Sequence, residues 1–319
     1  MTDEPVIPDT REAGAPVPGR RTPPRIVVAV NPSAHGGRGA PGAQRAVALL
    51  RERGADVLEL RREGARELAE AVAGSLDGAD AVVAVGGDGV VNLVANVLAG
   101  TDTPLGVIPT GTGNDAARLL GIPLQDVGAA VDAVFEGLGG PVRRIDLGRV
   151  EWDGGHQDFV NVASAGFDAR VAERANRWRW PRGQAKYTAA MVRELASFRP
   201  LPMTLTVDGA RREIRAMLVS VANGPAFGGG MLVAPEASAE DGRLDLVVLS
   251  PLSRPAFVRV FPKVFRGEHV GHPAVGIEPC TSVRIEAEGV VVYADGERIA
   301  PAPVRISIVP RALAVLAPS

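Results

Sequence analysis

Three glycine-rich turns in the first half of the sequence could bind a phosphorylated ligand. Each follows a short apolar run and precedes an amphipathic stretch, so each is expected between the end of a strand and the start of a helix. Glycine lets backbone N–H groups approach an anion closely, and the first turn of a helix adds N–H groups that lack a partner within the helix. The three turns are residues 31–39 (NPSAHGGRG), 86–89 (GGDG) and 109–115 (PTGTGND).

The side chains of these turns suit a nucleotide. Asn31 adds an amide to the first turn, and Asp88 gives the second a carboxylate that could hold nucleotide-bound magnesium. The third turn adds the hydroxyls of Thr110 and Thr112 beside two glycines. An ordinary capped strand-to-helix connection accounts for any one turn more simply. Three at consecutive strand ends favour a polyphosphate site, because open parallel sheets bind ligands at that edge.

Two common nucleotide motifs are excluded. The sequence contains no GxxxxGK[ST] and no strand followed by GxGxxG. The site is therefore neither a P-loop nor a dinucleotide fingerprint of the usual type.

The elements that position these turns alternate between strand and helix. This rhythm predicts a parallel sheet covered by helices. The expected strands are 25–31, 56–60, 80–85 and 105–109, and the expected helices are 43–54, 65–76, 90–100 and 114–121.

After about residue 144 the pattern changes to short apolar strands, several separated by Asp-Gly or glycine-rich turns, which predicts a mainly antiparallel β domain. The expected strands are 142–152, 157–163, 203–209, 212–224, 243–250, 281–289 and 290–299. Helices are expected at 168–176, 184–198 and 254–265.

Composition narrows the functional classes. The 319 residues are 46% hydrophobic, enough for two cores, and 35 basic against 37 acidic residues leave a net charge of -2. No global field would attract nucleic acid, so any membrane contact must be local. No run reaches the roughly 20 apolar residues of a transmembrane helix, and the acidic, proline-rich start is unlike a signal peptide. We therefore expect a cytoplasmic protein.

Six blocks of the sequence, in order, resemble the catalytic-domain family of bacterial diacylglycerol kinases, relatives of sphingosine and ceramide kinases. The blocks are NPSAHGG, VGGDGVVNLVANVL, PTGTGNDAARLLGIP, NVASAGFDARV, VANGPAFGGGMLVAPEASAEDGRLDLVVL and YADGERI. The resemblance implies an α/β plus all-β fold: an NAD kinase-like nucleotide domain, then an antiparallel β-sandwich, with the active site in the cleft between them. It also implies ATP and magnesium as cofactors, and transfer of the γ-phosphoryl group to a hydroxyl of diacylglycerol or a related lipid.

Composition and the change of pattern near residue 144 give the expected domain limits, and the resemblance adds the return of the last strands to the first domain. A disordered leader would occupy residues 1–24, the nucleotide-binding domain 25–144 and the lipid-substrate sandwich 145–302, with residues 303–319 returning to the first domain. The enzyme would act peripherally at a membrane surface, and a homodimer is possible.

Site residues are carried over position by position. Asp295 and Glu297 would be the catalytic acids, Asp88 would bind magnesium, and Asp241 would hold a structural cation. The nucleotide would contact Asn31, Pro32, Ser33, Gly86, Gly87, Asp88, Gly89, Asn92, Thr110, Gly111, Thr112, Gly113, Asn114 and Asp115.

Asp295 has a second interpretation. Asp-Gly also occurs at 153–154 and 208–209, where it is expected only to turn hairpins, so spacing alone does not separate the two roles. The resemblance favours the catalytic one.

Two positions depart from the family pattern. Val90 and Leu93 stand where relatives usually have threonine and glutamate. Because the hydroxyl and the carboxylate of those residues are missing here, one alternative is a catalytically impaired regulator that binds nucleotide or lipid. A soluble-substrate kinase like NAD kinase, which also uses GGDG, is the other.

Two further segments could contact lipid. Residues 177–183 (RWRWPRG) place Trp178 and Trp180 among arginines, a composition that suits a headgroup interface and equally suits packing on the sandwich. Residues 227–231 (FGGGM) could form an apolar lip for an acyl chain or a simple connection.

Overall fold

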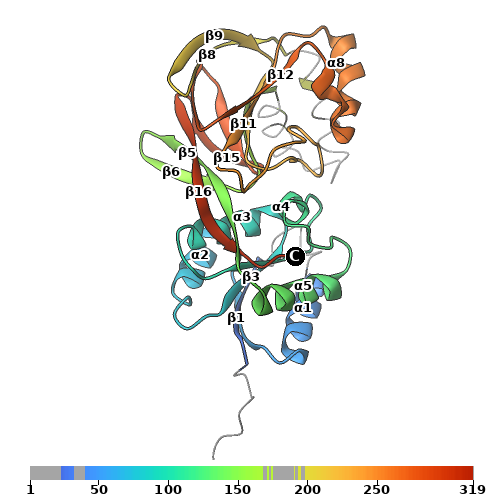
Figure 1. Cartoon of the computed structure of the whole chain (residues 1–319), viewed down its shortest axis with the longest axis vertical. Helices are drawn as coiled ribbons and strands as arrows, with labels where there is room; N and C mark the ends of the chain where they lie inside the picture. Colours follow the sequence, from blue (N-terminus) through green and yellow to red (C-terminus); the bar gives the residue numbers. More distant parts are fainter. Residues whose placement is uncertain are drawn as a thin grey trace, which may run out of the picture.

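The computed structural model describes residues 23–31, 40–167, 171, 174, 190, 193–194 and 198–318. An α/β half and a β-rich half are stacked along the long axis of the molecule (Figure 1). Several predictions fall outside these residues: residues 1–22 of the predicted leader, Pro32, Ser33, Trp178, Trp180, and nearly all of the helices predicted at 168–176 and 184–198.

Parallel strands build the sheet of the first half, in the order β2-β1-β3-β4. Helices α1 and α5 pack together on one side and α2 and α3 on the other (Figure 1), so every residue of β3 and β4 is buried. The predicted helix-covered parallel sheet is confirmed. The elements are β1 (Arg25–Val30), α1 (Ala40–Glu52), β2 (Asp56–Arg61), α2 (Ala65–Ala73), β3 (Ala81–Gly86), α3 (Asp88–Leu98), β4 (Leu105–Pro109), α4 (Asp115–Leu119) and α5 (Val127–Gly139).

The second half is a sandwich of antiparallel strands, as predicted. One sheet has the order β12-β11-β10-β7-β14-β15, and strands β5, β6, β8, β9, β13 and β16 face it. Leu205 and Ile285 of one layer meet Val221 and Leu246 of the other in the core. The elements are β5 (Arg143–Trp152), β6 (Gly155–Phe159), β7 (Val162–Gly166), β8 (Leu201–Val207), β9 (Ala210–Ala216), β10 (Leu218–Ala222), β11 (Leu244–Leu249), α8 (Arg254–Val260), η2 (Phe261–Arg266), η3 (Glu268–Gly271), β12 (Val275–Cys280), β13 (Ser282–Glu286), β14 (Val291–Ala294), β15 (Glu297–Pro301) and β16 (Val304–Val315).

Two predicted strands were wrong in the same way. Residues 157–163 form β6 and β7, and residues 212–224 lie in β9 and β10, with the two members of each pair in different sheets. The chain crosses between layers at Val160–Asn161 and at Met217. Each crossing keeps buried, apolar neighbours on both sides, so the apolar pattern continues where the strand ends.

Strand β16 connects the two halves. It pairs with β13 and β5 in the sandwich, and its last residue, Val315, pairs in parallel with Leu105 of β4. One ten-stranded sheet therefore runs through both halves (Figure 1). The predicted domain boundary after residue 144 falls inside β5, the main partner of β16.

Candidate active site

A cavity of about 620 Å³ lies between the two halves, with polar residues at one end and apolar residues over the rest of its wall. The polar end receives loops from both halves. Its carboxylates are Asp88 and Asp115 of the α/β half and Asp295 and Glu297 of the sandwich.

The glycine-rich turns pack too closely for larger residues. A Cβ atom on Gly111 would lie 2.5 Å from the Cα atom of Gly87, and one on Gly113 would lie 2.6 Å from Asp88 Oδ2. The GGDG and GTGN turns are thus in direct contact, with backbone against backbone. Asn114 closes the GTGN turn with two hydrogen bonds to Gly111. Its Oδ1 accepts from the Gly111 N–H (3.1 Å), and its Nδ2 donates to the Gly111 carbonyl (2.9 Å).

Asp88 and Asp115 form the acidic side of these turns. Asp88 Oδ1 accepts the Ala116 N–H at the start of α4 (3.1 Å), and Asp115 Oδ2 accepts the Gly229 N–H from the sandwich (2.7 Å). Asp115 Oδ1 is buried without a hydrogen-bond partner among the described residues, although Arg118 Nε lies 3.6 Å away. Burial, and secondarily the neighbouring Asp88, raise the pKa of Asp115. A cation at this point would relieve both effects.

Asp295 is held by the backbone of the turn between β6 and β7. Its Oδ2 accepts the Val160 N–H (2.7 Å), and its Oδ1 accepts the N–H groups of Asn161 (3.0 Å) and Val162 (3.1 Å). Burial, and secondarily the charge on Asp88, raise the pKa of Asp295 to about 7 against the lowering effect of these donors. Both carboxylate oxygens are thus engaged in fixing the chain.

The turn at Asp208 supplies an internal comparison. Asp208 and Asp295 both have positive φ values, 45° and 47°, and each is followed by a glycine in a hairpin turn. Asp208 likewise accepts backbone N–H groups, from Thr281 and Ser282. The two turns share one local structure, so the Asp-Gly sequence alone does not mark a catalytic site. They differ in location, because only the Asp295 turn lines the cavity.

Glu297 begins β15, directly after this turn. Its Oε1 lies 3.4 Å from where a Cβ atom on Gly89 would be, and its Oε2 accepts a long hydrogen bond from Gln157 Nε2 (3.5 Å). Although Glu297 is an exposed residue, burial of its carboxylate raises the pKa of that group. A sandwich carboxylate with an available lone pair therefore stands against the GGDG turn.

Most of the other residues that line the cavity are apolar, with Ser164 and His269 among the polar exceptions. Phe167 and Leu249 contribute from the sandwich, and Phe257, Phe261 and Val264 contribute from α8 and η2. The aromatic rings contact one another, with centroids 5.0 Å apart for Phe167–Phe257 and 5.8 Å apart for Phe257–Phe261. Such a wall suits hydrocarbon chains.

The structure divides the predicted nucleotide residues into three groups. Those on the cavity wall are Asn31, Gly87, Asp88, Gly89, Thr112, Gly113 and Asp115. Those that shape the turns without lining the cavity are Gly86, Thr110, Gly111 and Asn114. Asn92 is buried on α3 and accepts a hydrogen bond from Asn96 Nδ2 (3.2 Å), away from the cavity wall.

Asp241 does not line the cavity, and its Oδ1 accepts the Arg243 N–H (2.9 Å). Within the described ranges no group of three or more His, Cys, Asp or Glu side chains is arranged to hold a metal ion. A structural cation at Asp241 stays a prediction.

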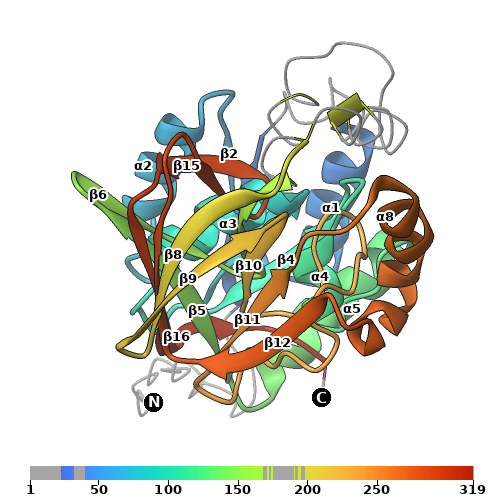
Figure 2. The same ribbon diagram turned by 90° about the horizontal axis from the view of Figure 1, so that it is seen from above.

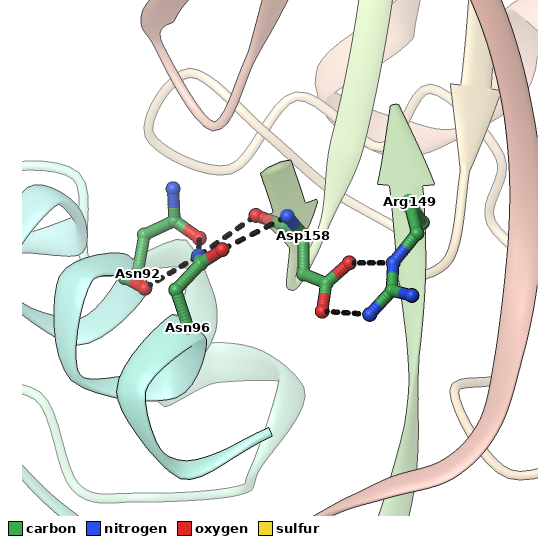
Figure 3. A network of polar contacts seen from close by, with 4 residues as sticks. All are labelled: Asn92, Asn96, Arg149 and Asp158. Atoms are coloured by element: carbon green, nitrogen blue, oxygen red, sulfur yellow. Dashed lines mark hydrogen bonds and ion pairs between the residues drawn. The ribbon is translucent and has the colours of Figure 1, made fainter. Parts of the chain in front are cut away.

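A polar network fixes α3, which begins at the GGDG turn, against the sandwich (Figure 3). Asn96 Nδ2 donates to the Asp158 carbonyl (2.9 Å), and Asn96 Oδ1 accepts the Asp158 N–H (2.9 Å). Arg149 Nε and Nη2 donate to the Asp158 carboxylate (2.6 and 2.9 Å). The sequence did not predict this network or the roles of Gln157, Asn161 and Gly229. Asn161 and Gly229 do lie in quoted parts of the sequence, NVASAGFDARV and FGGGM.

Two glycine-rich turns of one domain, faced by carboxylates from a second domain, are an arrangement typical of a phosphotransferase. The diacylglycerol kinase catalytic domain profile matches residues 25–150, and the profile of the YegS C-terminal NAD kinase beta sandwich-like domain matches residues 161–317. A Mycobacterium tuberculosis (strain CDC 1551 / Oshkosh) protein named diacylglycerol kinase is 42% identical over 297 residues, covering 92% of this chain and 95% of that protein.

A Bacillus subtilis (strain 168) diacylglycerol kinase is 35% identical over 227 residues, which cover 68% of this chain and 71% of the relative. A solved structure of a Bacillus anthracis diacylglycerol kinase shares the fold, with a TM-score of 0.68, 23% identity and coverage of 93% of this chain and 97% of that one. The chain belongs to the diacylglycerol kinase family of lipid kinases, phosphotransferases with an alcohol acceptor. No helix in the described part of the chain is long and apolar enough to cross a membrane.

Proposed function

We propose that this lipid kinase transfers the γ-phosphoryl group of ATP to the free hydroxyl of diacylglycerol, with Mg²⁺ bound to the nucleotide. The observation that carries this proposal is the position of Glu297. Its carboxylate, supplied by the sandwich, lies against Gly89 of the proposed phosphate-binding turn, in a cavity whose other lining residues are mostly apolar.

The donor set fits a magnesium nucleotide. Backbone N–H groups of the GGDG and GTGN turns would bind phosphate oxygens. Mg²⁺ usually takes one or two carboxylates, with waters and phosphate oxygens completing its coordination. Asp88 and the unpartnered Oδ1 of Asp115 supply hard oxygen ligands of this kind. The ion would neutralise charge on the phosphates during transfer.

Glu297 is the proposed general base, in preference to Asp295, the other acid that the sequence leaves open. A base needs a lone pair within reach of the hydroxyl proton. Both oxygens of Asp295 already accept backbone N–H groups, whereas Glu297 accepts one long hydrogen bond from the Gln157 side chain. Asp295 is proposed as a positioning residue that fixes the turn from which Glu297 projects.

Diacylglycerol is favoured over a soluble acceptor by the apolar wall. A hydroxyl beside Glu297 would leave its acyl chains against Phe167, Phe257 and Phe261. A dinucleotide such as NAD, the acceptor of an NAD kinase, would instead leave polar groups unpaired against these rings, which is unfavourable. The same apolar wall favours an enzyme that takes its lipid substrate from a membrane surface.

The departures at Val90 and Leu93 leave the proposed chemistry intact. Val90 is buried and packs on Gly86, where a Cβ atom would lie 2.9 Å from its methyl carbon. Leu93 lines the cavity as an apolar residue. Neither position supplies a group that the proposed transfer requires.

The test is a direct assay of purified protein with γ-labelled ATP, Mg²⁺ and dispersed diacylglycerol, followed by identification of the labelled product. We expect labelled phosphatidic acid, and loss of at least ~100-fold in kcat for Glu297→Gln with ATP affinity retained. Adenosine or NAD as acceptor is the matched comparison. ATP binding without turnover on any lipid would instead identify a catalytically impaired regulator.

A further inference from the structure

The segment formed by α8 and η2 has one face inside the cavity. Phe257, Val260, Phe261 and Val264 line the cavity at spacings of three and four residues, so they share one side of the helical path. The rings of Phe261 and Phe265 extend the aromatic contacts towards the surface, with centroids 5.9 Å apart. This segment is therefore a thin wall between the apolar cavity and the outside.

The outer face of the same segment combines apolar and basic residues. Val258 is 61% exposed and Val270 on η3 is 45% exposed, and Phe265, which also lines the cavity, is 40% exposed at its rim. The exposed residues Arg254, Arg259, Lys263 and Arg266 lie among them. We name this set, Arg254, Val258, Arg259, Lys263, Phe265, Arg266 and Val270, the α8 surface. It stands at the periphery of the sandwich half in both views (Figures 1 and 2).

The charge of the α8 surface contrasts with that of the whole chain. Between Asp245 and Glu268 the sequence has four basic residues and no acidic one, although the complete chain has a net charge of -2. Arg266 pairs with Glu268 at 3.6 Å, so Arg254, Arg259 and Lys263 carry most of the local positive field. Exposed apolar groups among cations match a bilayer that presents anionic headgroups over hydrocarbon.

We propose that the α8 surface docks onto an anionic bilayer and that the lipid substrate enters the cavity beside this segment. The inference rests on the proposed function, because it identifies where the acceptor comes from. A helix is only about 10 Å across with its side chains. A lipid leaving the membrane at this face would therefore meet Phe257 and Phe261 after a short displacement, with its chains in apolar surroundings throughout.

The first experiment measures vesicle binding without ATP, so it does not depend on turnover. Full-length protein is sedimented with phosphatidylcholine vesicles that contain or lack phosphatidylglycerol. We expect binding only to the anionic vesicles, weakening as salt rises. Arg259→Gln combined with Lys263→Gln should weaken the partition about 10- to 30-fold, from about fivefold for each cation near the surface.

A matched control removes the same charge elsewhere. Arg45 and Arg51 are exposed on α1 of the α/β half, and Arg45→Gln with Arg51→Gln should leave vesicle binding within about twofold of the parent protein. A separate Val258→Ser variant should weaken binding with little change in its salt dependence, because it removes apolar contact alone.

The second experiment separates docking from chemistry. With a short-chain diacylglycerol dissolved as monomers, the Arg259 and Lys263 double variant should retain parental kcat, because neither side chain lines the cavity. With the long-chain substrate in anionic vesicles its rate should fall in parallel with binding. A parent protein that binds vesicles but never phosphorylates the dissolved substrate would refute the proposed function and leave the docking surface standing.

Equal vesicle binding by parent and double variant would overturn the docking proposal. So would an equal loss in the Arg45 and Arg51 control, which would indicate general charge attraction. If the double variant instead changes the sedimentation coefficient of the protein in solution, the α8 surface is an interface between two copies of the chain and the proposal is wrong.

Discussion

Replacing Asp295 by asparagine should reduce stability more than the same replacement at Asp208. At Asp295 an amide oxygen in the place of Oδ1 still accepts from Asn161 and Val162. The NH₂ group then takes the place of Oδ2, which accepts the Val160 N–H at 2.7 Å in the parent protein. Two hydrogen-bond donors therefore face each other in the variant. Leaving one part-buried donor unpaired reduces the free energy of unfolding by about 1–3 kcal/mol.

Asparagine at Asp208, the control position, should cost less stability. Asp208 Oδ1 accepts from the Thr281 N–H, the Thr281 hydroxyl and the Ser282 N–H, at 3.1, 2.7 and 2.8 Å, and Oδ2 accepts only a longer contact from the same Thr281 N–H, at 3.2 Å. An amide oxygen in the place of Oδ1 preserves these three contacts, so the charge and the longer Oδ2 contact are all that is lost. Asp208→Asn should therefore lower the free energy of unfolding by less than about 1 kcal/mol. Urea denaturation of both variants, with m-values compared, measures the difference.

Activity should separate Asp295 from Glu297. Asp295→Asn should lower kcat through displacement of the 160–162 backbone and of the turn that carries Glu297, in step with its loss of stability. Glu297→Gln should lower kcat by ~100-fold or more without lowering stability. An Asp295→Asn protein that is as stable as the parent and inactive, beside an active Glu297→Gln protein, would refute this division of roles and make Asp295 the base.

Three further predictions concern the same site. Because burial raises the pKa of Glu297 and the base must be ionised, kcat/KM should fall on the acid side with an apparent pKa above that of an ordinary glutamate, and the pH–rate profile of Glu297→Gln should lack this limb. Gly111→Ala would place a Cβ atom 2.5 Å from Gly87 Cα, so we expect it to lower ATP affinity at least ~10-fold by calorimetry, whereas Gly139→Ala in α5, with no atom within 4 Å, should bind ATP normally. Asn96→Ala removes both hydrogen bonds to the Asp158 backbone and should lower the free energy of unfolding by about 2 kcal/mol in urea; an unchanged midpoint would show that α3 is held to the sandwich by packing alone.

The sequence predicted the nucleotide half well because its signals are local. Glycines at the ends of β3 and β4 follow fully buried apolar strands, a junction typical of ligand-binding parallel sheets. Helix α5 was missed, although Asp126 caps it by accepting the Gly128 and Ala129 N–H groups (2.8 and 3.1 Å). Six of its 13 residues are glycine or alanine, which weakens the apolar period that marks a helix.

The cavity could be predicted only in outline. Nothing local in DGE shows that Asp295 will bond to residues more than 130 positions earlier, or that Glu297 will reach Gly89. The apolar wall was also beyond the sequence, since Phe257 and Phe261 follow a pattern common to any packed helix. Such partners are fixed by tertiary packing, and the domain limits likewise stay predictions.

The long pairing of β5 with β16 has a mechanical consequence. A single flexible linker would let the two halves swing freely, whereas a two-stranded ribbon resists bending and mainly permits twist. Its register is interrupted between Val309 and Leu313, where Arg311 adopts a φ of 51° and donates its N–H to Asp146 Oδ1 (2.6 Å). Any opening of the cleft to exchange nucleotide would concentrate its torsion at this bulge, so Asp146 would set the stiffness of the movement from a position remote from both substrates.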